Sequence, residues 1–318
     1  MAALAGVFAM SHSPFCYMPP ERWNEVRASR SLRPDVPLDD VEVNRAKAAR
    51  VATAFATLKA ELAAAAPDVL AVFGDDQLEC FDFANFPAFA VYAGGTFHGT
   101  LAGGGRTRVP GHPSLAAALL SGLMRRGFDP AFSLDMPKPE RGIGHAFLRP
   151  AESLTDFTVP IVPVFLNCYY APQPTALRCY QLGAAVREII AEHPDPIRVA
   201  VVGSGGLWHT PRAKDAYLDE AFDQAILKAM TAGDARAMAR YFDDYDVPAG
   251  DASQALGGRG PAATGLPGAS GPQGGTRETC NWIAAAGVAG GTPATLIDYV
   301  PIYASPIGAG FAFWRNGR

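Results

Sequence analysis

A histidine follows a strand-like run at residues 201–211, whose sequence is VVGSGGLWHTP. The mostly apolar run at 197–202 has the length of a buried strand, and three glycines mark a sharp turn at its end. The chain therefore places the imidazole of His209 beyond the carboxyl end of a core strand, where open α/β sheets bind their ligands. The glycine spacing fits neither common phosphate-binding pattern, GxGxxG or GxxxxGKS/T. His209 is thus a candidate for acid–base chemistry, with a plain turn residue as the alternative.

Metal-capable side chains follow two further predicted strands and open one predicted helix: His12, Asp75, Asp76, Gln77, Glu79 and Glu278. The first follows the apolar run at 4–10, and the next four follow the run at 68–73. If the strands are parallel, their carboxyl ends meet at one edge of the sheet, so these groups converge with His209. Imidazole and carboxylate groups are common ligands of divalent metals. Each group also has a structural alternative: His12 and the Asp pair as turn or cap residues, and Glu278 as a charge that complements a helix dipole.

Strands alternate with helices along the chain. Strand-like runs lie at residues 4–10, 68–73, 87–92, 157–167, 198–202 and 295–299, and helical spacing lies at 41–65, 114–124, 175–193, 217–231, 234–242 and 276–286. This alternation predicts an α/β fold, a single-domain α/β/α sandwich over residues 1–318 with a central mixed, largely parallel sheet. Two prolines in the 157–167 run favour an edge or irregular strand, and Ser114 is a plausible N-cap of its helix. Residues 248–275 are rich in Gly, Ala, Pro and Ser, so we expect a mobile loop or lid there.

Composition argues against several classes of protein. The formal net charge is −4 and no run of Lys or Arg occurs, so we expect no nucleic-acid partner. No apolar stretch approaches the roughly 18 residues of a membrane span, and the first residues lack the basic start of a signal peptide. We therefore expect a cytoplasmic protein without membrane contact. The five cysteines are scattered without a CxxC pair, which is typical of reduced thiols.

Six segments together carry a resemblance to a known family. They are SHSP at residues 11–14, DVLAVFGDDQLECF at 68–81, GHPSLA at 111–116, PVFLNCYYAPQPTALRCYQLG at 163–183, GSGGLWH at 203–209 and GGTRETCNW at 274–282. In their order and spacing the chain resembles, nearly from end to end, the class III extradiol ring-cleavage dioxygenases of the protocatechuate 4,5-dioxygenase catalytic (β) subunit type. Within that family it is most similar to the 3-O-methylgallate and gallate dioxygenase-like branch.

The resemblance implies a mononuclear non-haem Fe(II) site with two His ligands, one carboxylate ligand and open positions for catechol and O2. His12 falls on the family's first His ligand, and Glu278 falls on its carboxylate. The second His ligand falls on Gln77, a departure that would supply a neutral and weaker oxygen ligand. Glu79 is a candidate to assist it, because residues 77 and 79 of a regular strand would share a face.

The resemblance also implies roles for other pocket residues. His209 falls on the catalytic His, which accepts a substrate hydroxyl proton and later supplies a proton for O–O cleavage. His112 and His145 fall on positions that bind substrate oxygens or a carboxylate, with loop histidines as the alternative. Trp208 stands where relatives often have a small residue, and we expect it to narrow the pocket or stack on an aromatic ring.

The resemblance further implies the partners of the chain. They are O2 and a substituted catechol of the protocatechuate or gallate kind, carboxylated and in some cases methoxylated. Family members commonly form homodimers, and some use a separate small partner subunit to cover the active site. We expect the loop at 248–275 to serve as that cover here.

The residues leave two other functions open. A metal-dependent hydrolase of the same fold would use its metal, for instance zinc, to activate water and would not need O2. A non-catalytic binding subunit would have kept the fold and lost the iron site, and Gln77 is the argument for it. The joint presence of His12, His209 and Glu278 favours the dioxygenase.

Overall fold

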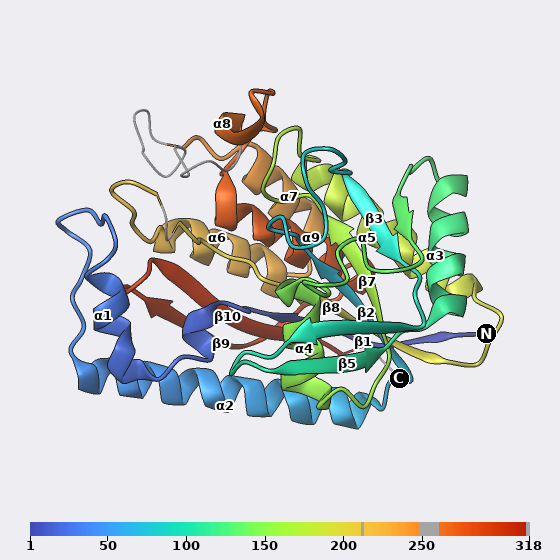
Figure 1. Ribbon diagram of the computed structural model, residues 1–318, viewed down its shortest axis with the longest axis horizontal. Coiled ribbons are helices and arrows are strands. Elements are labelled where there is room, and N and C mark those ends of the chain that lie inside the picture. Colours follow the sequence, from blue (N-terminus) through green and yellow to red (C-terminus); the bar gives the residue numbers. More distant parts are fainter. Residues whose placement is uncertain (211–212, 248–260, 316–318) are drawn as a thin grey trace.

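The computed structural model describes residues 1–210, 213–247 and 261–315 (Figure 1). Its centre is an eight-stranded sheet with the order β6-β3-β7-β2-β8-β1-β10-β9. These strands are β1 (Ala3–Met10), β2 (Val69–Gly74), β3 (Phe89–Tyr92), β6 (Ala131–Ser133), β7 (Ile161–Leu166), β8 (Arg198–Ser204), β9 (Thr295–Ile302) and β10 (Ile307–Trp314). A separate two-stranded sheet pairs β4 (Thr96–Thr100) with β5 (Arg106–Pro110).

The four central strands β7, β2, β8 and β1 run parallel to one another. Every residue of β2 and β7 is buried, which explains why these strands read as continuous apolar runs rather than alternating ones. On either side of this group, β3 pairs antiparallel with β7 and β10 pairs antiparallel with β1. The parallel order brings the carboxyl ends of β1, β2 and β8 to one edge of the sheet.

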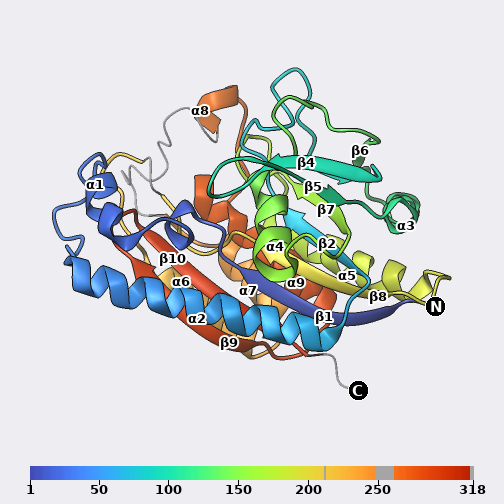
Figure 2. The same cartoon turned by 60° about the horizontal axis from the view of Figure 1, so that its bottom comes forward.

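Helices cover both faces of the sheet (Figures 1 and 2). One layer contains α2 (Val41–Ala65) and α4 (His145–Thr155), and the other contains α3 (Pro113–Arg125), α5 (Ala176–Glu192), α6 (Glu220–Thr231), α7 (Ala235–Asp243) and α9 (Thr279–Ala289). Each helical layer packs against one face of the sheet and forms a separate apolar core with it, because alternate side chains of a strand point to opposite faces. Val7 and Ala9 of β1 belong to one core, and Phe8 and Met10 belong to the other. The predicted α/β sandwich with a mixed, largely parallel sheet is confirmed.

Two predictions about local structure were wrong. Helix α3 begins at Pro113 with His112 as its N-cap, not at Ser114, because the fixed φ of proline suits the first helical position. Of the two alternatives for the prolines at 157–167, the edge strand is wrong, because β7 lies inside the sheet between β3 and β2. Its ladder with β3 covers only Val164–Leu166, so Pro163 lies outside that ladder.

The expected mobile loop at 248–275 is ordered over its second part. Residues 248–260 lie outside the described residues, but α8 (Pro261–Thr264) follows them, and residues 272–275 are buried. The small residues that suggested a loop instead allow close backbone packing. A Cβ atom at Gly271 would lie 2.2 Å from the carbonyl oxygen of Phe242.

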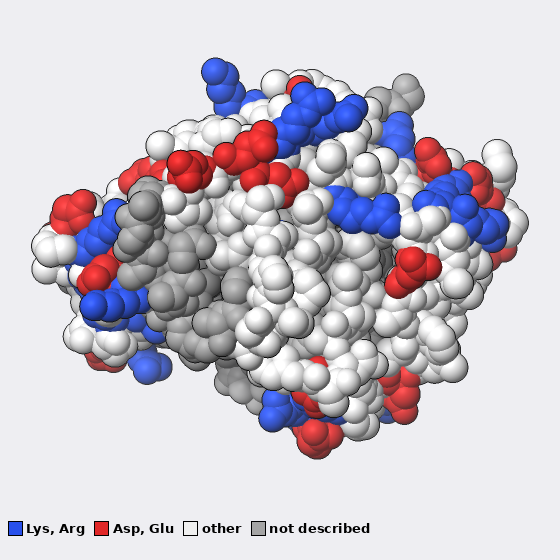
Figure 3. Space-filling model, turned by 90° about the horizontal axis from the view of Figure 1, so that it is seen from above, with Lys and Arg blue, Asp and Glu red and all other residues white. Residues whose placement is uncertain are grey.

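The described surface carries both signs of charge. On the face shown in Figure 3, acidic and basic side chains mix around the margin, and a broad area between them carries neither. Among the described residues, every helix is too short or too polar to span a membrane.

Candidate metal centre and active site

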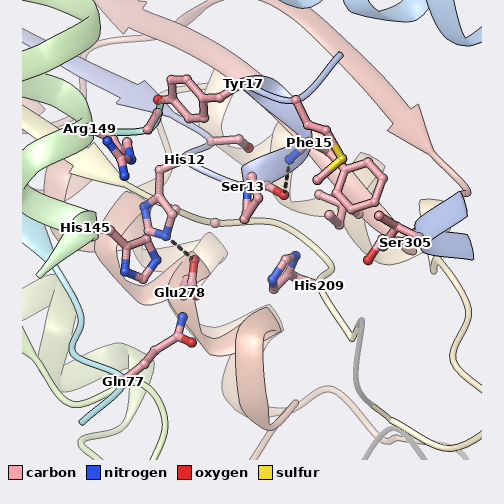
Figure 4. Close-up of a pocket in the computed structure, with 18 of the residues that line it drawn as sticks. His12, Ser13, Phe15, Tyr17, Gln77, His145, Arg149, His209, Glu278 and Ser305 are labelled. Atoms are coloured by element: carbon pink, nitrogen blue, oxygen red, sulfur yellow. Dashed lines mark hydrogen bonds and ion pairs between the residues drawn. The ribbon is translucent and has the colours of Figure 1, made fainter. Parts of the chain in front are cut away.

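A cavity of about 700 Å³ opens at the carboxyl ends of β1, β2 and β8, beside the start of α9 (Figure 4). Its inner wall is formed by His12, Gln77, Gly205, Gly206, His209 and Glu278. Its outer wall is formed by residues 14–30, which include the short helix α1 (Trp23–Arg27), and by Arg149 of α4. The inner wall therefore collects side chains from three strand ends and one helix start, as the sequence predicts.

His12 is buried just beyond the end of β1. Its Nδ1 lies 2.9 Å from Ser204 Oγ at the end of β8, and its Nε2 lies 3.3 Å from Glu278 Oε2. Burial, followed by the charges of His145 and His209, lowers the pKa of His12 well below its usual range. A neutral imidazole whose Nδ1 is held by a hydrogen-bond partner is the usual arrangement of a histidine that binds metal through Nε2.

Asp75 is the first residue after β2 and is completely buried. Ligand atoms of His12, Asp75 and Glu278 all lie within 4.8 Å of one another. Among the described residues, neither carboxylate oxygen of Asp75 has a hydrogen-bond partner. Burial, together with the charge of Glu278, raises the pKa of Asp75 well above its usual range. Because burying a carboxylate without a hydrogen-bond partner is costly and a cation would compensate the charges of both Asp75 and Glu278, this donor set fits a divalent metal ion.

Gln77 lines the cavity, and its amide belongs to a hydrogen-bond chain. Its Nε2 donates to the hydroxyl of Tyr169 at 3.0 Å, and that hydroxyl donates to Glu278 Oε1. Tyr169 follows β7 and is fully buried, so the chain fixes the orientation of the Glu278 carboxylate. Gln77 thus reaches Glu278 through Tyr169, beside the cluster of histidine and carboxylate groups formed by His12, Asp75 and Glu278.

Glu79 is engaged by His145. Its Oε1 accepts the backbone N–H of His145 at 3.1 Å and lies 2.8 Å from Nδ1 of the same residue. Burial alone would lower the pKa of His145 and raise that of Glu79, but their mutual charges and hydrogen bonds outweigh it and shift both pKa values the opposite way. The His145 ring meets the His12 ring edge-on, with centroids 4.8 Å apart. Because β2 ends at Gly74, the strand alternation expected to align residues 77 and 79 does not apply, and Glu79 orients His145 instead.

His209 lies across the cavity from His145, with Glu278 between them (Figure 4). Its side chain is only partly buried, and its backbone N–H donates to Thr276 Oγ1 at 3.0 Å. It pairs as an isolated bridge with Ile307 at the start of β10, which keeps its backbone extended beside the sheet. An imidazole in this place can exchange a proton with a ligand in the cavity.

Glycines explain how the loop after β8 fits so tightly against the segment before α9. A Cβ atom at Gly205 would lie 2.4 Å from Glu278 Oε2, and one at Gly275 would lie 2.1 Å from His209 Cδ2. Gly205 also has a φ of +104°, a conformation that other residues rarely adopt. The glycines of both sequence motifs thus serve close backbone approach.

The sequence matches the family model described as the catalytic LigB subunit of aromatic ring-opening dioxygenase over residues 6–254, which is most of the chain. The chain belongs to this family. The family expected from the six sequence segments is therefore confirmed. The matched range ends before Glu278, so the role of this residue depends on the geometry described above and on the sequence resemblance.

Curated relatives of this LigB-family chain are dioxygenases. Gallate dioxygenase of Pseudomonas putida is 36% identical over 105 residues, which are 32% of this chain and 29% of the relative. The 2,3-dihydroxyphenylpropionate/2,3-dihydroxicinnamic acid 1,2-dioxygenase of Escherichia coli is 31% identical over 158 residues, which are 49% of this chain and 48% of the relative. The chain thus spans less than half the length of these relatives. Among solved structures, the uncharacterized protein JW3007 of Escherichia coli K12 aligns with a TM-score of 0.49 and 13% identity, covering 97% of this chain and 99% of that one.

Two residues that the resemblance placed in the substrate pocket of the LigB-family chain do not line the cavity. His112 is the N-cap of α3, and its Nδ1 accepts the N–H of Leu115 at 3.2 Å. Trp208 is buried on the opposite side of its strand end, where its Nε1 donates to the carbonyl oxygen of Tyr217 at 2.7 Å. Adjacent residues in an extended segment point opposite ways, so His209 faces the cavity and Trp208 faces the core.

Three arginines that the sequence analysis did not single out line the cavity: Arg22, Arg30 and Arg149. Arg149 pairs with Glu152 and donates to the carbonyl oxygen of Thr100 at 3.2 Å. Arg22 pairs with Glu25 at 3.6 Å and is largely exposed. Together these cations make the outer wall favourable for an anionic ligand.

The sequence analysis missed most of the residues that support the inner wall of this LigB-family site. Asp75 stood out as metal-capable, but the resemblance drew attention to Gln77 instead. Nothing in the sequence singled out Tyr169 or Ser204, because a tyrosine or serine after a strand is common and only the packing shows what it contacts.

Proposed function

We propose that this LigB-family protein is an Fe(II)-dependent extradiol dioxygenase that opens the aromatic ring of a substituted catechol with O2. The observation that carries the proposal is the buried cluster of His12, Asp75 and Glu278 beside a cavity that His209 faces. A metal-capable cluster, a neighbouring imidazole and an enclosed space are the parts that such a reaction needs.

His12, Glu278 and Asp75 are the proposed metal ligands, with Asp75 in the place where the resemblance had put Gln77. The support for Asp75 is its charge, its burial and its lack of any other partner among the described residues. Gln77 acts through Tyr169 on the orientation of Glu278. When bound, Fe(II) supplies the redox chemistry that permits O2 to react with a catechol.

The histidines of the cavity handle protons. His209 takes a proton from one substrate hydroxyl as the ring binds and returns it to oxygen during ring opening. His145, oriented by Glu79, donates a hydrogen bond to a substrate oxygen from the opposite side. Two imidazoles on opposite sides of Glu278 provide one group to accept a proton and one to hold the substrate in place.

A catechol that carries a carboxylate is the proposed substrate. The support is the arginine content of the outer wall, since guanidinium groups bind carboxylates well. The relatives are named for gallate and for dihydroxyphenylpropionate or dihydroxycinnamic acid, all of which are carboxylated catecholic compounds.

The test is anaerobic reconstitution with Fe(II), followed by oxygen uptake with protocatechuate, gallate, 3-O-methylgallate, 2,3-dihydroxyphenylpropionate and unsubstituted catechol. We expect one O2 consumed per substrate and a yellow ring-opened product, with a carboxylated compound preferred. His209→Gln is the matched variant, and it should bind iron normally while losing most of its turnover. A Zn(II)-loaded sample is the metal control and should take up no O2.

Each alternative function has its own result in this experiment. Hydrolytic activity of the Zn(II) sample without O2 would indicate a metal-dependent hydrolase. Failure of the wild-type protein to bind any divalent metal would contradict the metal site and indicate a non-catalytic binding subunit.

A further inference from the structure

Three consecutive backbone N–H groups before and at His209 are each held by a buried side-chain oxygen. Leu207 N–H donates to Thr279 Oγ1 at 3.0 Å, and His209 N–H donates to Thr276 Oγ1 at 3.0 Å. Between them, Trp208 N–H donates to Asp223 Oδ1 at 2.7 Å. Most buried loops satisfy their N–H groups with backbone carbonyls or water, so three side-chain acceptors in a row fix this segment unusually firmly.

Two of these three acceptors flank the proposed metal ligand Glu278. Thr276 lies two residues before Glu278 in the 3-10 turn Gly274–Glu278, and Thr279 follows it as the first residue of α9. Both threonines are completely buried. Because Thr276 and Thr279 belong to the same turn and helix start as Glu278, their hydrogen bonds couple the backbone of residues 207–209 to the backbone that carries Glu278.

Glycine contacts also limit the distance between the loop after β8, which carries His209, and the turn before α9, which carries Glu278. Gly275 packs against the imidazole and the carbonyl oxygen of His209, and Gly205 packs against the carboxylate of Glu278. Each of the two functional residues thus contacts a glycine from the segment that carries the other. The threonine hydrogen bonds and the glycine contacts together fix the position of His209 relative to Glu278.

The third acceptor fixes the same loop from the side of β10. Asp223 of α6 also accepts the hydroxyl of Tyr299 at 2.7 Å, and a Cβ atom at Gly308 would lie 2.0 Å from its Oδ2. The N–H of Gly308 donates in turn to the carbonyl oxygen of Trp208 at 2.9 Å. The loop is therefore held between β10 and α9.

We propose that Thr276 and Thr279 are positioning residues that set the imidazole of His209 against Glu278, and hence against the substrate. This inference rests on the proposed function for its effect on turnover. A displacement of about 1 Å in a catalytic group can cost about 100-fold in rate, so a device that fixes this distance has a direct kinetic consequence.

The decisive variant is Thr276→Val, which keeps the shape of the side chain and removes the acceptor. Thr276→Ser keeps the hydroxyl and tests rescue. Thr155→Val is the matched control, because Thr155 is also buried but its hydroxyl contacts only the carbonyl oxygen of Ala151 in its own helix. For each Fe(II)-loaded variant, kcat, KM, iron content and amide hydrogen exchange of the peptide covering residues 205–210 are measured.

We expect Thr276→Val to lower kcat at least about ten-fold, with KM and iron content near wild type and faster exchange in that peptide. Thr276→Ser and Thr155→Val should remain close to wild type. The proposal is overturned if Thr276→Val exchanges faster but keeps its kcat, or if its loss of turnover only follows a loss of iron.

Failure of the proposed function has a different signature. If wild-type protein oxidises none of the catechols, the exchange measurement alone decides the positioning role. Faster exchange in Thr276→Val but not in Thr276→Ser then supports it, and equal exchange in all variants refutes it.

Discussion

The two walls of the cavity are built in different ways. On the inner wall, the side chains of His12 and Glu278 expose 3% and 5% of their surface. On the outer wall, the side chain of Arg22 exposes 61% of its surface and forms an ion pair with Glu25, three residues further on. The inner wall is anchored in four secondary-structure elements, whereas most of the outer wall is a series of short helices and turns between β1 and α2.

Under the proposed function, the inner wall carries the reacting groups and the outer wall carries the groups that recognise the substrate. Reacting groups must be held within a fraction of an ångström, and the strand ends and helix start of the inner wall are fixed by glycine contacts and buried hydrogen bonds. Groups that attract and select a substrate tolerate more movement and lie on a surface segment that can change without disturbing the core. Variants of the inner wall should therefore change metal binding and turnover, and variants of the outer wall should change KM and selectivity.

Glu278→Gln tests the inner wall most severely. It removes the charge of one of the two clustered carboxylates and leaves the Tyr169 hydroxyl a neutral amide oxygen as its acceptor. We expect metal affinity to fall by more than about 100-fold, since even loss of an outer hydrogen-bond partner of a ligand costs about 10- to 100-fold, and turnover should be undetectable. Metal titration followed by oxygen uptake measures both, and a variant that retained stoichiometric iron would show that Glu278 is not a ligand.

Asp75→Asn and Gln77→Ala together decide which residue completes the ligand set. Asp75 has a buried carboxylate beside His12 and Glu278, so its neutral amide should weaken metal binding by about 100-fold. Gln77→Ala removes only the donor to Tyr169 and should weaken binding by about ten-fold or less. Competition with a chelator measures both affinities, and the reverse order of effects would assign the ligand to Gln77.

Gly205→Ala compared with Gly104→Ala measures how tightly the inner wall is packed. Both glycines have positive φ values, +104° and +89°, so both variants carry a backbone cost of about 1–3 kcal/mol. Only at Gly205 would the new Cβ atom collide with Glu278, whereas at Gly104 nothing lies within 4 Å. We expect Gly205→Ala to lose about 1–3 kcal/mol more in the free energy of unfolding and to bind metal more weakly. Denaturant unfolding checks this, and equal losses in the two variants would argue against a close contact at Glu278.

The sequence predicted the inner wall better than the outer wall for a physical reason. Apolar runs mark buried parallel strands, and parallel strands bring their carboxyl ends together, so His12 and His209 could be placed at one edge without knowing any contact. The strand end at 74–77 placed Asp75 and Gln77 at the same edge, and the sequence alone does not show that Asp75 lies beside His12 and Glu278 while Gln77 contacts Tyr169. Hydrogen bonds such as that of Tyr169 with Glu278 depend on rotamers and leave no pattern in the chain.

Other differences between the sequence analysis and the structure have a similar origin. The resemblance assigned His112 to the pocket, and Trp208 was added because it stands beside His209, but neither residue lines the cavity. His112 caps α3, and the extended backbone directs Trp208 into the core. Strand β10 was not predicted, because the Gly-Ala-Gly run at 308–310 after its first residue has low strand propensity, yet β10 pairs with β1. Small residues there are required by close neighbours: a Cβ atom at Gly310 would lie 2.7 Å from Leu207 Cδ1.

Arg30→Gln tests the outer wall and should have the smallest effect. Arg30 lines the cavity from the turn after α1. For a carboxylated catechol we expect KM to rise about three- to ten-fold, equivalent to about 0.7–1.4 kcal/mol, with kcat and iron content unchanged. The KM of unsubstituted catechol should not change, because it has no carboxylate to bind.

Arg315→Gln is the matched control, since Arg315 is exposed and pairs with Glu61 at the far end of β10. Steady-state kinetics at two salt concentrations measures the effect, and the difference between wild type and Arg30→Gln should shrink at high salt. A fall in kcat with both substrates would mean that the outer wall also positions reacting groups, and the division between the two walls would then be wrong.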